Sequence, residues 1–283
     1  MTDISTSPGL LELSWRYLLL GVIQGITEFL PISSTAHLKV VPVALGWPDP
    51  GVTVTAVLQL GSIFAVFAYF RRDLNKVLKG ILMGLLNGQW NHPDARLGIS
   101  IFWGTIPILF CGGLIKFFWK GYEDSFFRST PSIGLVSILM ALFLAFAERK
   151  GHRHKSLKEV KAVDGLIVGF SQIMALIPGV SRSGVTLSTA LLNGWERRDA
   201  ARFSFLLGIP AITMAGLVEV KDVLQGSSVS ELLPLLVGMG SAAFISWLSI
   251  RWLLKYLQSH STWIFVGYRM FFGIALLASW ASF

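Results

Sequence analysis

Long apolar runs dominate the chain, and hydrophobic and polar positions do not alternate within them. A helix needs roughly 20 apolar residues to cross a bilayer. Strands would show a two-residue alternation instead, so helices are the elements that satisfy the backbone in lipid. The pattern predicts an all-α polytopic membrane protein with six transmembrane helices, at about 52–70, 98–118, 131–148, 201–220, 232–254 and 262–282.

Two further apolar stretches are interrupted and do not fit as simple spans. The stretch at about 10–46 is broken by Pro31 and Pro42, and the stretch at about 163–194 is broken at Ile177-Pro178-Gly179. Irregular backbone is tolerated at membrane depth only where protein or water surrounds it. Both stretches are therefore predicted to be re-entrant helical hairpins.

Basic residues set the orientation of the predicted spans. They follow the first and third spans, precede the fourth and end the fifth, at Arg71, Arg72, Lys76, Lys79, Arg149, Lys150, Arg153, Lys155, Lys158, Lys161, Arg197, Arg198, Arg202, Arg251 and Lys255. With six crossings all of these fall on one side, which the positive-inside rule makes cytoplasmic. The loops at 121–130 and 221–231 fall outside and carry the acidic residues Glu123, Asp124, Asp222 and Glu231. The first hairpin then enters from outside and the second from the cytoplasm.

The two halves of the chain resemble each other. Three pairs of residues have the same separation along the chain, namely Gly21 and Gly169, Gln24 and Gln172, and Ser33 and Ser181. Opposite entry sides make such a repeat an inverted one, with its breaks meeting near the middle of the membrane. We expect one integral membrane domain over 1–283, with a first repeat at 10–125 and a second at 163–283.

Composition supports this class of protein and excludes others. The chain is 53% hydrophobic and 14% charged, with a mean hydropathy of +0.63, whereas about a quarter of a soluble domain is charged. The net charge of +8 is explained by basic cytoplasmic loops, so no nucleic-acid partner is expected. Cys111 is the one cysteine, and no Cys/His cluster has the spacing of a zinc site.

Hydroxyl side chains follow both breaks and predict helix caps. Ser33 is suited to cap a helix that begins near Thr35, and Ser181 or Ser183 is suited to the same role in the second hairpin. Helix N-termini favour phosphate, and the guanidinium of Arg182 can pair with phosphate oxygens bidentately. The alternatives are ordinary capping for the serines and a buried carboxylate as the partner of the arginine.

The first break also collects ionisable side chains. Gln24 and Glu28 share a helix face, where they could hold a divalent cation or orient a hydroxyl, and Glu28 could instead pair with Arg182. His37 lies one turn beyond Ser34, so an imidazole could activate a hydroxyl or an attacking water. The alternative is a buried histidine bonded to a carbonyl.

One arginine falls inside the last predicted span. Arg269 follows Tyr268 there, and a charged side chain at membrane depth needs a partner or a cavity. We therefore consider Arg269 as a second phosphate ligand.

These motifs resemble a known family. Gln24-Gly-Ile-Thr-Glu-Phe-Leu-Pro-Ile-Ser-Ser-Thr-Ala-His37 is similar to its (E/Q)xxxE block with the following Ser-Ser-Thr-x-His, and Pro178-Gly-Val-Ser-Arg-Ser-Gly-Val-Thr186 is similar to its PGxSRSxxT block. The segments Gln59–Ser62 and Phe203–Leu207 also match. The family is undecaprenyl-diphosphate phosphatase of the bacitracin-resistance type.

The resemblance implies hydrolysis of undecaprenyl diphosphate to undecaprenyl phosphate, which recycles the lipid carrier for cell-wall synthesis. It implies a bacterial inner-membrane protein whose active site opens to the outer, periplasmic face, and a divalent cation, Mg²⁺ or Ca²⁺. The positions that match the family's catalytic residues are Glu28, Ser34, His37 and Arg182, and those that match its substrate site are Gln24, Thr35, Ser181, Ser183 and Thr186. Many members have Glu where this chain has Gln24, so this side chain should orient or coordinate rather than act as a base.

Two other functions fit the same pattern. A lipid-phosphate transporter or flippase would also use broken helices in an inverted repeat, and a third reading is a non-catalytic binder of diphosphate lipids. The sequence leaves open whether Ser34 or water attacks the phosphorus, and whether the chain forms a homodimer.

Overall fold

A computed structural model describes residues 9–119, 121–122, 125–226 and 229–281. Apart from one isolated bridge between Lys155 and Trp195, the regular structure of these residues is helical. The helices are α1 (Leu10–Thr27), α2 (Ser34–Ala44), α3 (Gly51–Tyr69), α4 (Arg71–Asn87), α5 (Pro93–Phe118), α6 (Thr130–Lys150), α7 (Ala162–Gln172), α8 (Arg182–Leu192), α9 (Arg197–Gly226), α10 (Val229–Tyr256) and α11 (Trp263–Ala281), with 3-10 helices at Phe126–Arg128, Leu157–Glu159 and Ile173–Leu176.

The long helices match the predicted spans. Within the described residues, parts of α5, α6, α9, α10 and α11 are each long and apolar enough to cross a membrane. The predicted span at 52–70 coincides with α3, whose part from Val54 to Tyr69 qualifies as a span together with α4, across a bend of 74°. The chain is therefore a multi-pass helical membrane protein.

Helix α4 is not predicted by the pattern of apolar residues. Its basic residues lower the hydropathy of the segment, so no apolar run marks it. It forms because Val77, Gly80 and Gly84 recur on one face and are buried, with α5 as the neighbouring helix. Gly88 ends it in the left-handed conformation, with φ 69°, which favours glycine.

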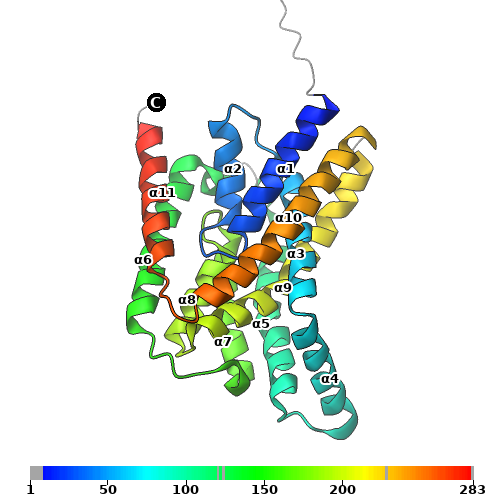
Figure 1. Cartoon of the computed structure of the whole chain (residues 1–283), viewed down its shortest axis with the longest axis vertical. Coiled ribbons are helices and arrows are strands. Elements are labelled where there is room, and N and C mark those ends of the chain that lie inside the picture. The colour runs from blue at the N-terminus through cyan, green and yellow to red at the C-terminus, as the bar shows by residue number, and fades with distance from the viewer. Residues whose placement is uncertain (1–8, 120, 123–124, 227–228, 282–283) are drawn as a thin grey trace, which may run out of the picture.

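Both interrupted stretches are helix–break–helix hairpins. Figure 1 shows α1 and α2 side by side, with their outer ends toward the top of the view and the break below. In the second hairpin Asn193 Nδ2 donates to Asp164 Oδ1 at 2.7 Å, which joins the end of α8 to the start of α7. Pro31 lies in the first break as expected, but the expected break at Pro42 is wrong. Pro42 lies inside α2, which continues to Ala44, because a proline lacks only its own N–H bond and the residues after it can still donate.

The two breaks end in nearly the same strained conformation. Ser33 has φ 75° and ψ 98°, and Ser181 has φ 68° and ψ 108°. A positive φ is uncommon for a residue other than glycine. Two serines at equivalent sequence positions therefore start α2 and α8 by the same backbone geometry.

Each hairpin packs against a helix of the other half of the chain. Helix α1 lies on α10 and α7 lies on α5, while α3 pairs with α9 and α6 with α11. The first two contacts are close: a Cβ on Gly21 would lie 2.1 Å from the Gly238 carbonyl oxygen, and one on Gly169 would lie 2.3 Å from that of Gly104. Glycine is needed at both crossings.

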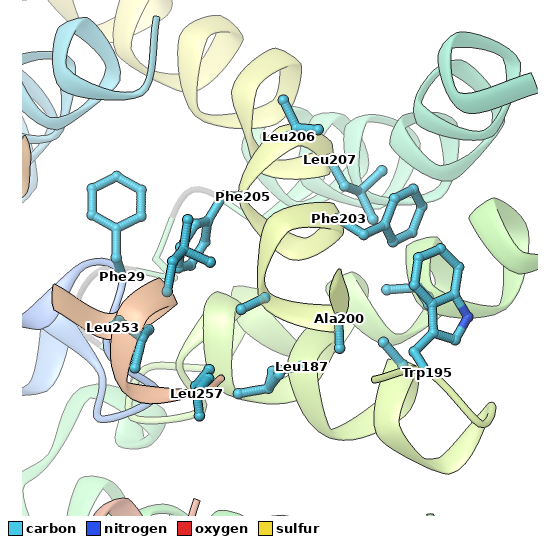
Figure 2. Close-up of a cluster of buried hydrophobic side chains, with 14 of the residues drawn as sticks. Phe29, Leu187, Trp195, Ala200, Phe203, Phe205, Leu206, Leu207, Leu253 and Leu257 are labelled. Atoms are coloured by element: carbon cyan, nitrogen blue, oxygen red, sulfur yellow. The ribbon is translucent and has the colours of Figure 1, made fainter. Parts of the chain in front are cut away.

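The main hydrophobic core lies around α8, α9 and the end of α10. Figure 2 shows Phe29 from the first break facing Phe205 of α9, beside Leu253 of α10. The Phe29 and Phe205 rings meet edge to face, with centroids 5.1 Å apart. This core anchors the first break to the long helices and so fixes the residues that flank Phe29.

The predicted outer loops are only partly described. Glu123 and Asp124 lie outside the described residues. The predicted loop at 221–231 is largely helical, since α9 continues to Gly226 and α10 begins at Val229. The side chains of Asp222 and Glu231 lie outside the described part of the chain.

Candidate active site

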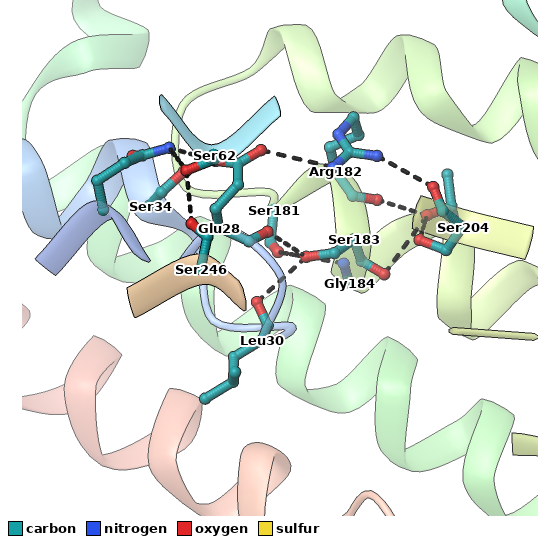
Figure 3. A network of polar contacts seen from close by, with 12 residues as sticks. Glu28, Leu30, Ser34, Ser62, Ser181, Arg182, Ser183, Gly184, Ser204 and Ser246 are labelled. Atoms are coloured by element: carbon teal, nitrogen blue, oxygen red, sulfur yellow. Dashed lines mark hydrogen bonds and ion pairs between the residues drawn. The ribbon is translucent and has the colours of Figure 1, made fainter. Parts of the chain in front are cut away.

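Three side chains of the first hairpin converge on one carboxylate. Gln24 lies in the last turns of α1, Glu28 follows that helix, and Ser34 is the first residue of α2. Gln24 Nε2 donates to Glu28 Oε2 at 3.0 Å, and the Ser34 hydroxyl donates to the same oxygen at 2.6 Å. All three are buried. Figure 3 shows Glu28 between Ser34 on one side and Arg182 of the second hairpin on the other.

Arg182 of α8 completes the group from the second hairpin. Its Nη2 lies 3.5 Å from Glu28 Oε1, and its Nη1 donates to the Ser204 carbonyl at 3.1 Å. Its Nε is buried and has no partner within the described residues. The expected pairing of Glu28 with Arg182 is therefore present, and one guanidinium N–H is left for a ligand.

A glycine makes room for this guanidinium. A Cβ placed on Gly208 of α9 would lie 1.8 Å from Arg182 Nη1 and 2.4 Å from Cζ. Real Cβ atoms are not found this close to another atom, so the guanidinium lies against bare backbone. Gly208 therefore fixes how far Arg182 reaches toward Glu28.

The serines after the second break connect the two hairpins. The Ser183 hydroxyl lies 3.0 Å from the Glu28 carbonyl and 3.1 Å from the Leu30 carbonyl. Thr186 Oγ1 lies 2.5 Å from Ser204 Oγ. Because both side chains are buried and bonded within the protein, they build the frame that holds Glu28 and Arg182.

Both predicted caps are confirmed. Ser33 Oγ accepts from Ala36 N at 3.4 Å, and Ser181 Oγ accepts from Gly184 N at 3.1 Å. Each cap also contacts the hydroxyl two residues on, at 3.2 Å to Thr35 in the first case and 3.2 Å to Ser183 in the second. Thr35 is exposed, so it is the most solvent-accessible of the predicted substrate-binding residues.

His37 does not pair with Ser34, which corrects the pairing expected from their spacing. His37 Nδ1 lies 2.7 Å from the Ser33 carbonyl oxygen, and Nε2 lies 2.6 Å from the Tyr268 hydroxyl. A carbonyl only accepts, so Nδ1 carries a proton and Nε2 of the neutral ring accepts from Tyr268. The ring also stacks on Phe272, with centroids 4.4 Å apart.

Arg269 binds backbone carbonyls rather than facing the Glu28 group. Its Nη1 donates to Pro31 at 3.1 Å, its Nη2 to Gly179 at 2.7 Å and its Nε to Ser137 at 3.3 Å. The side chain is 1% exposed. The expectation of a second phosphate ligand is corrected accordingly, because the guanidinium of Arg269 bonds to carbonyls of both breaks and of α6.

Comparison with known proteins decides the family. The family model described as "Bacitracin resistance protein BacA" matches residues 17–275. The chain belongs to the BacA family. Proteins named undecaprenyl-diphosphatase are 63% identical to it over 282 residues in Prochlorococcus marinus strain MIT 9303, covering all of this chain and 96% of the relative, and in Synechococcus sp. strain WH7803, covering all of this chain and 99% of the relative. The protein of that name from Parasynechococcus marenigrum is 62% identical, covering 99% of this chain and 98% of the relative.

Several residues of this BacA-family site were not singled out from the sequence. Ser62 accepts from Gln24 Nε2 at 3.3 Å and from the Ser246 hydroxyl at 2.8 Å. Ser62 and Ser204 lie in the two short segments that match the family, and that match was the available signal. No sequence signal marks Ser246. A single serine in an apolar helix can simply bond to its own backbone, and the sequence does not show whether it does.

The oxygen donors near Glu28 suit the divalent cation expected for a BacA-family member. Among the described residues no three His, Cys, Asp or Glu side chains gather into a metal cluster. Gln24 Oε1, however, is buried without a partner beside the Glu28 carboxylate. Hard cations such as Mg²⁺ bind through one or two such oxygens and complete their shell with water and substrate phosphate. The donor set therefore fits a cation that binds with the substrate.

Proposed function

We propose that this chain hydrolyses undecaprenyl diphosphate to undecaprenyl phosphate and inorganic phosphate. The names of its close, full-length relatives support this substrate and this reaction. The observation that carries the proposal is the buried group in which Ser34 donates to Glu28 while Arg182 approaches the same carboxylate from the other hairpin. A hydroxyl, a base and a guanidinium with a free N–H are what phosphoryl transfer requires.

In this proposal Arg182 binds the diphosphate. Its unpartnered Nε–H and the first N–H groups of α2 and α8 are donors for phosphate oxygens. Planar guanidinium groups pair with phosphate bidentately, and helix N-termini favour anions. The bare backbone of Gly208 lets the guanidinium keep this position.

Ser34 is the proposed nucleophile and Glu28 its base. The Ser34 oxygen attacks the terminal phosphorus, its proton passes to Glu28 Oε2, and the bond from that phosphorus to the bridging oxygen breaks. Undecaprenyl phosphate leaves with the bridging oxygen. Water then cleaves the phosphoserine, and Glu28 returns the proton to Ser34.

His37 is proposed to activate the water of the second step. The Ser33 carbonyl accepts from Nδ1–H, so Nε2 has the lone pair that takes a proton from the attacking water. The imidazolium then gives that proton to the departing inorganic phosphate. Tyr268 bonds to Nε2 here and must yield it to water during turnover. If water attacks the lipid diphosphate directly, His37 takes its proton in the same way.

A divalent cation, Mg²⁺ or Ca²⁺, is proposed to bind at Glu28 and Gln24. When bound it would offset the charge that builds on the transferred phosphoryl group. Gln24 has no titratable proton, so its role is to orient and coordinate through Oε1.

We further propose a bacterial inner-membrane location with six transmembrane helices and two re-entrant hairpins. The matching Ser33 and Ser181 conformations and the exchanged packing of α1 on α10 and α7 on α5 support an inverted repeat. The pairing of α6 with α11 extends the proposed first repeat from 10–125 to the end of α6. The first hairpin then opens to the outer face, where the lipid diphosphate enters.

Phosphate release from undecaprenyl diphosphate by purified protein in detergent tests the proposed function. An enzyme releases phosphate without a membrane to cross, whereas a transporter or a non-catalytic binder releases none. Arg182→Ala should lower release at least about 100-fold, while Arg198→Ala, at an exposed arginine, should not change it. No release by the native chain would refute the function, and release by Arg182→Ala would refute the site.

A further inference from the structure

Helix α4 exposes a continuous apolar stripe that no described part of the chain covers. The exposed leucines are four, three and one residues apart, which places them on one side of a helix. They are Leu78, 58% exposed, Leu82, 46%, Leu85, 66%, and Leu86, 80%. The opposite side is buried at Val77, Gly80 and Gly84. The stripe therefore faces away from α5, and in water it would be unfavourable.

Basic side chains run beside this stripe. Arg72, Lys76 and Lys79 are exposed and project from the face next to the leucines. A helix with neighbouring apolar and basic faces binds in the plane of an anionic bilayer surface. The 74° bend between α3 and α4 turns α4 away from the direction of the preceding span, which this placement requires.

A cavity opens at the bend itself. It has a volume of about 280 Å³ and is lined by Ala68, Tyr69, Arg71, Arg72 and Trp247. The guanidinium of Arg251 lies over the Trp247 ring, 5.6 Å from the ring centroid. Arginine and aromatic side chains together are typical of the head-group level of a membrane.

The cavity carries uncompensated positive charge. Neither Arg71 nor Arg72 has an acidic side chain within ion-pair distance in the described part of the chain. The nearest acid in sequence, Asp73, already pairs with Arg202 at 3.0 Å. Two free guanidinium groups in one cavity are therefore available to a phosphate.

We propose that this cavity binds the head group of an anionic glycerophospholipid of the cytoplasmic leaflet. Arg71 and Arg72 pair with its phosphodiester, Tyr69 and Trp247 flank the glycerol region, and the acyl chains lie along the leucine stripe of α4. The site is separate from the Glu28 group and takes no part in the proposed hydrolysis.

Native mass spectrometry of the full chain in detergent, titrated with phosphatidylglycerol and with phosphatidylcholine of the same acyl chains, tests this site. We expect one phosphatidylglycerol per chain, bound about 10-fold more tightly than phosphatidylcholine. Arg71→Gln with Arg72→Gln should remove this preference. Lys158→Gln with Arg198→Gln, which removes the same charge at two other exposed basic positions, should keep it.

Equal binding of the two lipids by the native chain would overturn the proposal, as would a preference that survives in the Arg71/Arg72 double variant. Both arginines are exposed, so the double variant is expected to fold. The single variants Arg71→Gln and Arg72→Gln should each lose part of the preference and provide the same test if the double variant is unstable. Binding is measured without catalysis, so failure of this site and failure of the proposed phosphatase are distinguishable.

Discussion

At the scale of single residues, the site depends on side chains that are held by small neighbours. Gly208 sets the reach of Arg182, and Ser183 ties the carbonyl of Glu28 to the second hairpin. Glu28, His37 and Arg182 could be singled out from the sequence because ionisable side chains are costly in an apolar chain. The role of Gly208 could not be predicted, because the sequence does not show which side chain packs against a glycine.

Gly208→Ala should act as an Arg182 variant does. The added methyl group cannot occupy the space of the guanidinium, so the arginine must move away from Glu28. A displacement of about 1 Å at such a group can cost about 100-fold in rate. Phosphate release measures the effect, and Gly240→Ala, where an added Cβ meets nothing within 4 Å, is the matched control. Equal rates for the two variants would contradict the proposed role of Gly208.

Tyr268→Phe tests the partner of the imidazole. The variant keeps an aromatic ring but removes the hydroxyl that bonds Nε2 of His37. We expect roughly a 10-fold loss of phosphate release and a pH–rate profile of different shape, because His37 loses the group that orients Nε2. Tyr256→Phe serves as the control. An unchanged profile would show that Tyr268 is only a packing residue.

At the scale of elements, the two breaks are held together by one arginine. Sequence patterns predicted both breaks and both caps, because prolines, glycines and serines determine local backbone geometry directly. They did not predict α4, which depends on packing against α5, nor the partners of Arg269, which come from three elements far apart in the chain. Long-range partners of a buried cation are set by the fold and leave no local pattern.

Arg269→Met should destabilise the protein more than it changes substrate affinity. The change leaves the carbonyls of Pro31, Gly179 and Ser137 without this donor, at a cost of about 2–4 kcal/mol. Thermal unfolding in detergent should show Tm lower by about 5–10 °C, with Arg269→Lys intermediate and Arg198→Met unchanged. A raised KM with the native Tm would instead make Arg269 a phosphate ligand.

At the scale of the whole molecule, α1 begins and α11 ends at the same end of the bundle, and α4 extends from the opposite end (Figure 1). Six predicted crossings place both termini on one side, which agrees with this common end, and the basic residues assign the opposite end to the cytoplasm, an orientation that stays a prediction. The proposed orientation makes the loop at 45–50 external and the loop at 257–262 cytoplasmic.

Single cysteines in a Cys111→Ser background test that orientation. Pro48 and Ser259 are both exposed and lie in these two loops. A membrane-impermeant thiol reagent should label Pro48→Cys in cells with a permeable outer envelope, and Ser259→Cys only after the inner membrane is opened. The reverse pattern would invert the topology and place the first hairpin on the cytoplasmic side.

The central claim is that Ser34, activated by Glu28, attacks the terminal phosphorus. Rapid acid quench with undecaprenyl diphosphate labelled in its terminal phosphate tests it most directly. We predict label on the protein during turnover, located at Ser34 by peptide mapping and absent from Ser34→Ala. Steady hydrolysis by the native chain with no label on Ser34 at any quench time would contradict the claim and identify water as the nucleophile.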